Sequence, residues 1–206
     1  MTKIVNDPEE FPKDSLAGFT EIYGDYVQPV HGGVVRAAAS PESEVALVVG
    51  GGSGHYPAFA GWVGPGIAHG SVCGNIFASP SASQARSVIR AADNGAGTLM
   101  MFGNYAGDVL HFGQAAEQLR AEGYDIRIVE ITDDIASGTA ENHLQRRGIA
   151  GDFPVGKLVG AACAEGRSID EVEAIARHLN DLTRSLGEPF SGCTLQGATD
   201  PLFTDD

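Results

Sequence analysis

The stretch VALVVGGGSGHYPAFAGWVGPG, residues Val45 to Gly66, contains an apolar run that ends in three consecutive glycines. Val45–Val49 is short and uninterrupted, which is typical of a strand buried on both faces of a parallel sheet. The glycines that follow predict a tight turn whose backbone N–H groups can face a small polar ligand. His55 places a titratable imidazole at this turn. The alternative interpretation is a structural turn that carries a histidine by chance.

The middle of the chain alternates strand and helix patterns. Two further buried strands are predicted by GTLMMF and DIRIVEI. Between the strands, SPSASQARSVIRAADNG predicts a helix capped near Ser79 and ended at Gly95, and DVLHFGQAAEQLRAEG predicts one from Asp108 to Gly123. This alternation predicts an α/β fold in which helices flank a mostly parallel sheet with right-handed crossovers.

Further helices are predicted toward both ends. DSLAGFTEIYGDY has apolar residues at helical spacing, with Asp14 or Ser15 as the cap. Two consecutive helices are predicted by PVGKLVGAACAEG and SIDEVEAIARHLNDLTRSLG, and Ser168 with Glu171 forms a capping box for the second.

The domain boundary is expected near residue 190. SGCTL, which follows it, is expected to start one more strand. We therefore expect a ligand-binding α/β domain over residues 1–190, and over residues 191–206 the start of a second, truncated domain or a tail.

Composition excludes several classes of protein. The net charge of 13 − 27 = −14 repels a phosphate backbone, so no nucleic-acid partner is expected. No apolar run approaches the ~20 residues of a membrane span, and the N-terminus lacks the apolar centre of a signal peptide. Cys73, Cys163 and Cys193 lie far apart without a C-x-x-C pair, which indicates small core residues in a reducing compartment. We expect a cytoplasmic protein without membrane contact.

Two segments follow strands at the place where open α/β sheets bind ligands. GGGSGH is neither a Walker loop nor a dinucleotide fingerprint, because the last position of G-x-G-x-x-G falls on His55 or Pro57. GNYAGD, Gly103 to Asp108, ends in a carboxylate that as a helix cap would need no function. Alternatively, a hydroxyl substrate held between His55 and Asp108 is deprotonated as it attacks a phosphorus or carbonyl centre. We expect both side chains to face one crevice.

The remaining polar candidates are weaker. AENHLQRRG could bind an anion through Arg146 and Arg147, and the alternative is a solvated helix end. Five other histidines show no metal-ligand spacing and are interpreted as surface or packed residues: His31, His69, His111, His143 and His178. No metal site is predicted.

Five motifs occur in a fixed order along the chain: GGGSGH, GNIFASP (74–80), NYAGD (104–108), RRGIAG (146–151) and KLVGAACAEG (157–166). Together they resemble the dihydroxyacetone kinase family, specifically its ketose-binding K subunit or K domain. The resemblance extends from IVNDPEEF to GATDPLF, nearly the whole chain, and implies the N-terminal part of the K-domain fold.

The resemblance implies roles for individual residues. Gly52, Ser53 and Gly54 match the substrate loop of the family. His55 matches its active-site histidine, often called the proton acceptor. Asp108 matches a carboxylate that contacts the substrate hydroxyl and shares or holds the base role.

The implied activity is phosphorylation of the terminal hydroxyl of dihydroxyacetone or another short ketose. The phosphate comes from ATP on a separate nucleotide-binding L domain or subunit, or from a phosphotransferase relay. ATP and Mg²⁺ are therefore expected on the partner, with no cofactor bound by this chain. The sequence itself offers no cluster of acidic and basic residues typical of phosphoryl transfer. A homodimer is also expected.

Three residues depart from the pattern of the dihydroxyacetone type. Tyr56 and Phe59 stand where that type has Glu and His, and Phe59 should make the wall near the loop more apolar. Gly103 stands where the dihydroxyacetone type has a lysine that contacts the substrate. At this substrate-binding position the pocket should therefore be wider and less positive. The changes resemble the branch that acts on four-carbon ketoses such as erythrulose.

A fourth departure is an absence. The family holds its ketone covalently on a histidine in an H-G-E-P-G motif, and this motif does not occur in the 206 residues. The resemblance thus predicts either a fragment of a longer kinase, inactive alone, or a protein that binds without the covalent step. The competing functions are a non-catalytic ketose-binding regulatory paralogue and an unrelated small-molecule-binding α/β domain.

Overall fold

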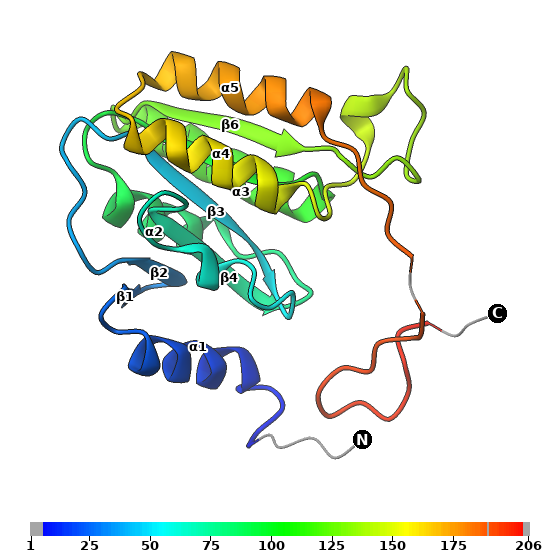
Figure 1. Ribbon diagram of the computed structural model, residues 1–206. Coiled ribbons are helices and arrows are strands. Elements are labelled where there is room, and N and C mark those ends of the chain that lie inside the picture. The colour runs from blue at the N-terminus through cyan, green and yellow to red at the C-terminus, as the bar shows by residue number, and fades with distance from the viewer. Residues whose placement is uncertain (1–5, 189, 204–206) are drawn as a thin grey trace.

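Six strands form one sheet in the order β1-β2-β4-β3-β5-β6 (Figure 1). The computed structural model describes residues 6–188 and 190–203. Strands β3 to β6 pair in parallel, and an antiparallel hairpin of β1 and β2 extends the sheet beyond β4. The predicted α/β class with a mostly parallel sheet is confirmed. The strands are Val27–Val30 (β1), Gly33–Arg36 (β2), Ala46–Ser53 (β3), Gly70–Ile76 (β4), Thr98–Gly103 (β5) and Ile126–Ile131 (β6).

The central strands are the ones that the apolar runs predict. All six residues of β5 and the first six of β3 are buried. Along β3, Leu47 and Val49 pack into the hydrophobic cluster on one face, whereas Ala46 and Val48 pack into the cluster on the other. Successive side chains of a strand point to opposite faces, so an uninterrupted apolar run requires cover on both sides.

Helices supply this cover (Figure 1). α2 and α3 pack on one face of the sheet and α4 and α5 on the other, while α1 packs against the hairpin end. Two short 3₁₀ helices lie within loops. The bounds are Phe11–Ile22 (α1), Ala82–Ala92 (α2), Ala106–Ala121 (α3), Asp152–Ala164 (α4), Ile169–Leu182 (α5), Ala60–Trp62 (η1) and His143–Gln145 (η2).

Helix starts were predicted with mixed success. The capping box of α5 is confirmed, because the Ser168 hydroxyl accepts from the N–H of Glu171 and the Glu171 side chain accepts from the N–H of Ser168. The predicted start of α2 is wrong, because Ser81 is its cap and not Ser79. The predicted start of α1 is also wrong. That helix begins at Phe11 with a proline in its first turn, so Asp14 lies inside it and caps nothing.

Strands β1, β2 and β4 were not predicted, and one predicted strand is wrong. Residues 191–195, SGCTL, are irregular. The tail curves back toward the start of the chain, where a Cβ placed on Gly197 would lie 2.9 Å from Pro8 (Figure 1). The division of the chain near residue 190 stays a prediction, and its last three residues, 204–206, lie outside the described residues.

The three cysteines are free thiols in different environments. Cys163 is a core residue, as predicted, and burial raises the pKa of its thiol to about 12. Burial also raises the pKa of Cys73, which is half-buried, to about 11. The prediction is wrong for Cys193, which is exposed. None of the helices within residues 6–188 and 190–203 combines the length and apolar character of a membrane-crossing segment.

Candidate functional site

A cavity of about 620 Å³ opens at the carboxyl ends of the neighbouring strands β3 and β5. Its walls are formed by the glycine turn (here residues 50–55), the loop with η1 that follows it, the end of β5, the first turn of α3 and the loop that leads into α4. The expectation that the glycines follow the strand is wrong, because β3 continues through them to Ser53 and the chain turns only from Gly54. Both His55 and Asp108 line it, so the expectation of one shared crevice is confirmed. The lining residues are Gly50, Gly51, Gly52, His55, Pro57, Ala58, Phe59, Trp62, Gly103, Tyr105, Asp108, Gly148, Ile149, Ala150, Asp152 and Phe153.

The glycine turn is shaped by close packing as well as by its position at the cavity. A Cβ on Gly51 would lie 2.7 Å from the ring of Phe59. Gly54 has φ +107°, a conformation that residues with a Cβ rarely adopt. Of the three predicted substrate-loop residues, Gly52 lines the cavity, whereas Ser53 and Gly54 do not. The Ser53 hydroxyl donates to the carbonyl oxygen of Gly74 at 2.7 Å, so β4 already holds this side chain.

His55 lies at the cavity with its ring exposed to solvent on one side. The ring centroids of Phe77 and Phe59 lie 5.0 Å and 6.5 Å from its own. The surrounding protein disfavours the charged imidazolium and lowers the pKa of His55 from its ordinary value of 6.5. The imidazole is therefore neutral at pH 7 and able to accept a proton.

Asp108 is the third residue of α3 and its side chain is only 8% exposed. The predicted cap role is wrong, because α3 begins after Tyr105 and has no side-chain cap. Burial raises the pKa of Asp108, although a hydrogen bond from Ser79 partly opposes this effect. Its Oδ1 atom is buried and has no hydrogen-bond partner among the described residues. Asp108 thus places a carboxyl group with one unpaired oxygen in the wall of the cavity that His55 also lines.

Asp152 is a second buried carboxylate in the cavity wall, and sequence reasoning did not identify it. It begins α4 directly after the RRGIAG motif. Its carboxyl group is 6% exposed and its Oδ1 atom has no partner among the described residues. Burial and the nearby charges of Asp133 and Asp108 raise the pKa of Asp152 well above the ordinary range. The only available signal was an acidic residue beside a recognised motif.

Three aromatic rings form one apolar wall. The centroids of Phe59 and Trp62 lie 5.1 Å apart, and those of Trp62 and Phe153 lie 5.5 Å apart. Phe59 thus makes the wall near the glycine turn apolar, as expected. Tyr56 does not line this cavity.

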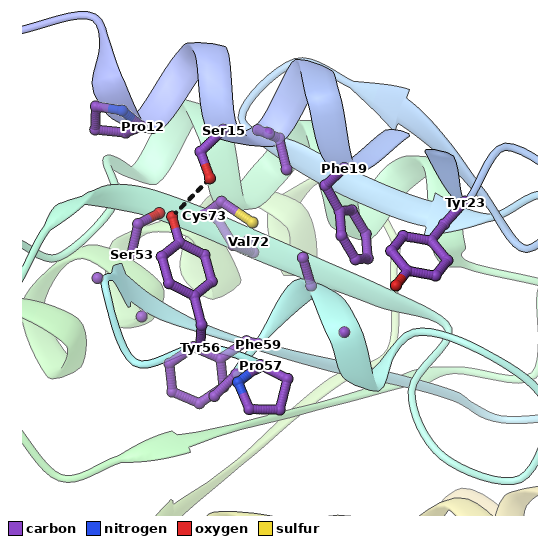
Figure 2. Close-up of a pocket in the computed structure, with 16 residues that line it drawn as sticks. Pro12, Ser15, Phe19, Tyr23, Ser53, Tyr56, Pro57, Phe59, Val72 and Cys73 are labelled. Carbon is purple, nitrogen blue, oxygen red and sulfur yellow. Dashed lines mark hydrogen bonds between the residues drawn. The ribbon is translucent and has the colours of Figure 1, made fainter. Parts of the chain in front are cut away.

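Tyr56 belongs to a neighbouring cavity of about 250 Å³ between α1 and the glycine turn. Figure 2 shows its hydroxyl directed at Ser15 of α1, at a distance of 3.1 Å. Phe19 of α1 and Tyr23, the residue directly after α1, add further aromatic walls (Figure 2). The change at position 56 therefore acts on the contact between α1 and the turn.

Among the residues that the structure describes, no arginine or lysine lines the 620 Å³ cavity. Arg146 is buried and donates to the carbonyl oxygen of Gly138 at 2.9 Å, so the expected solvated helix end is wrong for this residue. Arg147 pairs with Asp134 at 3.0 Å. Neither arginine lines the site.

The other histidines also lie outside the cavity lining. His69 is packed in the core and His111 contacts the carbonyl oxygen of Pro80 at 2.7 Å, whereas His31 and His178 are exposed. Within the described part of the chain, no cluster of three or more potential ligands could hold a metal ion.

The sheet, the glycine turn and a cavity with a few polar groups at the strand ends form an α/β domain of the class whose cavities hold small-molecule sites. Residues 17–206 match the Dak1 domain. The chain therefore belongs to the Dak1 domain family, that of the dihydroxyacetone kinases.

One curated relative is the L-erythrulose 1-kinase of Mycolicibacterium smegmatis, which is 58% identical over 98% of this chain and 36% of its own length. A crystal structure of the dihydroxyacetone kinase from C. freundii in complex with AMP-PNP and Mg²⁺ matches with a TM-score of 0.78 and 32% identity, over 86% of this chain and 33% of that one. The structure of the dihydroxyacetone kinase operon co-activator Dha-DhaQ matches with a TM-score of 0.74 and 32% identity, over 81% of this chain and 51% of that one. The chain spans about a third of the length of the two kinases.

Proposed function

We propose that this chain is the ketose-binding part of a kinase that phosphorylates the terminal hydroxyl of a short ketose. The observation that carries the proposal is the placement of a neutral imidazole, His55, and a buried carboxyl group, Asp108, in one cavity at the strand ends. The names of the similar proteins, an L-erythrulose kinase and a dihydroxyacetone kinase, agree with it.

The proposed chemistry uses both groups on one hydroxyl. The proton of the terminal hydroxyl passes to His55, with Asp108 accepting a hydrogen bond from the same hydroxyl or sharing the proton. The hydroxyl oxygen then forms a bond to the transferred phosphorus, and the bond from phosphorus to its leaving oxygen breaks. Gly52 allows the backbone to approach the ligand, and the wall of Phe59 and Trp62 keeps water from one side.

The phosphate donor is proposed to bind elsewhere. A triphosphate needs positive charge and Mg²⁺ around the transferred group. The cavity instead has two buried carboxyl groups, Asp108 and Asp152, and its lining within residues 6–188 and 190–203 contains no lysine or arginine. ATP and Mg²⁺ are therefore assigned to an L-type nucleotide-binding domain or subunit, with a phosphotransferase relay as the alternative donor. A homodimer in the cytoplasm completes the proposal.

The proposed substrate is a four-carbon ketose such as erythrulose. The L-erythrulose 1-kinase is 58% identical to this chain, whereas the C. freundii dihydroxyacetone kinase is 32% identical. The absence of a side chain at Gly103 widens the cavity next to Asp152. Dihydroxyacetone is expected as a second, smaller substrate.

A regulatory binder is the alternative function. The similar structure of an operon co-activator favours it, because this domain also occurs in a protein with that title. The two functions differ in turnover and not in ketose binding. A kinase needs His55 and Asp108 to remove the proton from the ketose hydroxyl, whereas a sensor needs the cavity only to bind the ketose.

Calorimetry and a phosphorylation assay test the proposal. The natural protein that contains this chain should bind erythrulose and dihydroxyacetone, and should phosphorylate them with ATP when its nucleotide-binding domain or subunit is present. The 206 residues alone should show no turnover. Turnover by the isolated chain would contradict the assignment of the nucleotide to a partner. Binding without turnover in the complete system would support the regulatory alternative, and absence of ketose binding would refute both.

A further inference from the structure

Asp152 has a buried carboxyl oxygen that no described group satisfies. The residue lines the 620 Å³ cavity, is 6% exposed, and leaves Oδ1 without a hydrogen-bond partner among the described residues. Buried polar atoms in native proteins are almost always paired, so an unpaired one in a cavity wall requires an explanation. A ligand that forms a hydrogen bond there supplies one.

Gly103 leaves the way to this carboxyl group open. A Cβ at position 103 would lie 3.4 Å from Oδ2 of Asp152, 3.1 Å from the carbonyl oxygen of Gly148 and 3.2 Å from the ring of Tyr105. A longer side chain at this position would occupy the space in front of the carboxyl group. The end of β5 and the start of α4 thus lie side by side in the cavity wall.

The position of Asp152 is fixed by the loop before it. The carboxylate of Asp133 accepts hydrogen bonds from the backbone N–H groups of Ile149 at 2.9 Å and Gly151 at 2.8 Å, and from the hydroxyl of Ser185. Asp133 is fully buried. Because these bonds hold the loop where α4 begins, the carboxyl group of Asp152 is preorganised before a ligand binds.

We propose that Asp152, reached past Gly103, hydrogen-bonds the hydroxyl group that a four-carbon ketose has and dihydroxyacetone lacks. The inference rests on the proposed function and names a specificity-determining residue for it. His55 and Asp108 take the reacting end of the ketose, and Asp152 takes the added carbon.

Cavity size alone does not select between the two ketoses. A four-carbon ketose has eight non-hydrogen atoms and occupies roughly 240 Å³ if each takes the ~30 Å³ of a water molecule. Both ketoses therefore fit within about 620 Å³. A buried polar group that needs a hydroxyl partner discriminates far more strongly than room for one carbon. The preference must then come from polar contacts, and Asp152 is the unpaired group beyond the reacting end.

The test compares two ketoses in the natural protein that contains this chain, with its nucleotide-binding domain or subunit. Asp152→Ala should lower kcat/KM for erythrulose about 10- to 100-fold, because the ketose hydroxyl is then buried without a hydrogen-bond partner. It should change kcat/KM for dihydroxyacetone less than about threefold. Asp152→Asn should lower kcat/KM for erythrulose less than Asp152→Ala does, because an amide also donates and accepts hydrogen bonds. Asp93→Asn, a half-buried carboxylate at the end of α2, is the matched control and should leave the ratio unchanged.

Gly103→Ala provides a second route that leaves Asp152 in place. Its methyl group, 3.4 Å from Oδ2, should lower the ratio of erythrulose to dihydroxyacetone activity about tenfold. Equal losses for both ketoses in Asp152→Ala and Gly103→Ala, or no loss in either, would overturn the assignment of Asp152 and leave the ketose-kinase proposal standing. A parent protein that binds neither ketose would overturn the proposed function itself.

Discussion

His69 should make the fold sensitive to acid. The residue is 2% exposed, and its Nδ1 atom accepts a hydrogen bond from the backbone N–H of Leu47 at 3.0 Å. Glu44 lies 3.1 Å from Nε2 and would favour a protonated ring, but Arg36 lies 3.1 Å from the same carboxylate oxygen and offsets its charge. Burial and Arg36 lower the pKa of His69 from 6.5 to about 3. The ring is neutral in the folded protein at every ordinary pH.

The sign and size of the effect follow from linkage. Because the folded pKa is below the unfolded one, the unfolded chain binds the proton more readily, and stability falls as the pH drops from 6.5 toward 3. Between pH 7.5 and pH 5 the histidine alone should cost about 2 kcal/mol of unfolding free energy, from 1.36 kcal/mol per pH unit over about 1.5 units. Any folded-state pKa below about 4 gives the same figure.

Urea unfolding followed by the fluorescence of Trp62 measures this cost. His69→Asn keeps an acceptor for the N–H of Leu47 and cannot be protonated. Relative to this variant, the parent protein should lose about 2 kcal/mol between pH 7.5 and pH 5. His178→Asn, at an exposed position of α5, should follow the parent. Parallel pH profiles for His69→Asn and the parent would refute the reasoning.

Five further outcomes concern the cavity and its neighbour. His55→Ala should lower kcat for both ketoses roughly 10²–10⁴-fold, and a change in KM alone would make the histidine a binding group. Because the pKa of His55 is lowered, the acid limb of the kcat/KM profile should fall below pH 6.5. Asp108→Asn should reduce kcat comparably if the two residues share the proton. Gly103→Lys should shift the kcat/KM ratio toward dihydroxyacetone, because the added chain fills the space beside the carboxyl group; an unchanged ratio would refute the size argument. Tyr56→Phe should lower stability by less than about 1 kcal/mol in thermal unfolding and leave kcat intact, because its hydroxyl bonds Ser15 of α1 and Tyr56 does not line the 620 Å³ cavity.

The parts of the fold that follow from local pattern were predictable. The short apolar runs of β3 and β5 favour buried strands, because an amphipathic helix is not apolar at every position. β6 also carries Arg127 and Glu130 and is only partly buried, but it continues the alternation of strands and helices. The short hairpin of β1 and β2 was not predictable. Val27–Val30 is four residues long and contains a proline, so its pairing with Gly33–Arg36 depends on the β4 edge that the fold supplies.

Of the two carboxyl groups in the cavity wall, the sequence predicted one as a site residue and not the other. Asp108 was located by its place after a buried strand, although the cap role considered for it is wrong. Asp152 was missed, because acidic residues are common in the first turn of helices and the sequence alone cannot show that this one is buried. Its burial results from a loop that Asp133 holds, 19 residues away in sequence. Only the packed structure brings that loop to the end of β5.

Gly103 and Asp152 are best understood as one feature. A longer side chain at position 103 would start 3.4 Å from Oδ2 of Asp152 and occupy the space in front of that carboxyl group. With glycine, Oδ1 of Asp152 stays buried without a hydrogen-bond partner among the described residues, which is costly. In the proposed site a ligand hydroxyl provides this hydrogen bond, so glycine at position 103 would give both the room for a longer polyol and the need for its hydroxyl. By this reasoning, the specificity belongs to the pair, and neither residue shows it when considered alone.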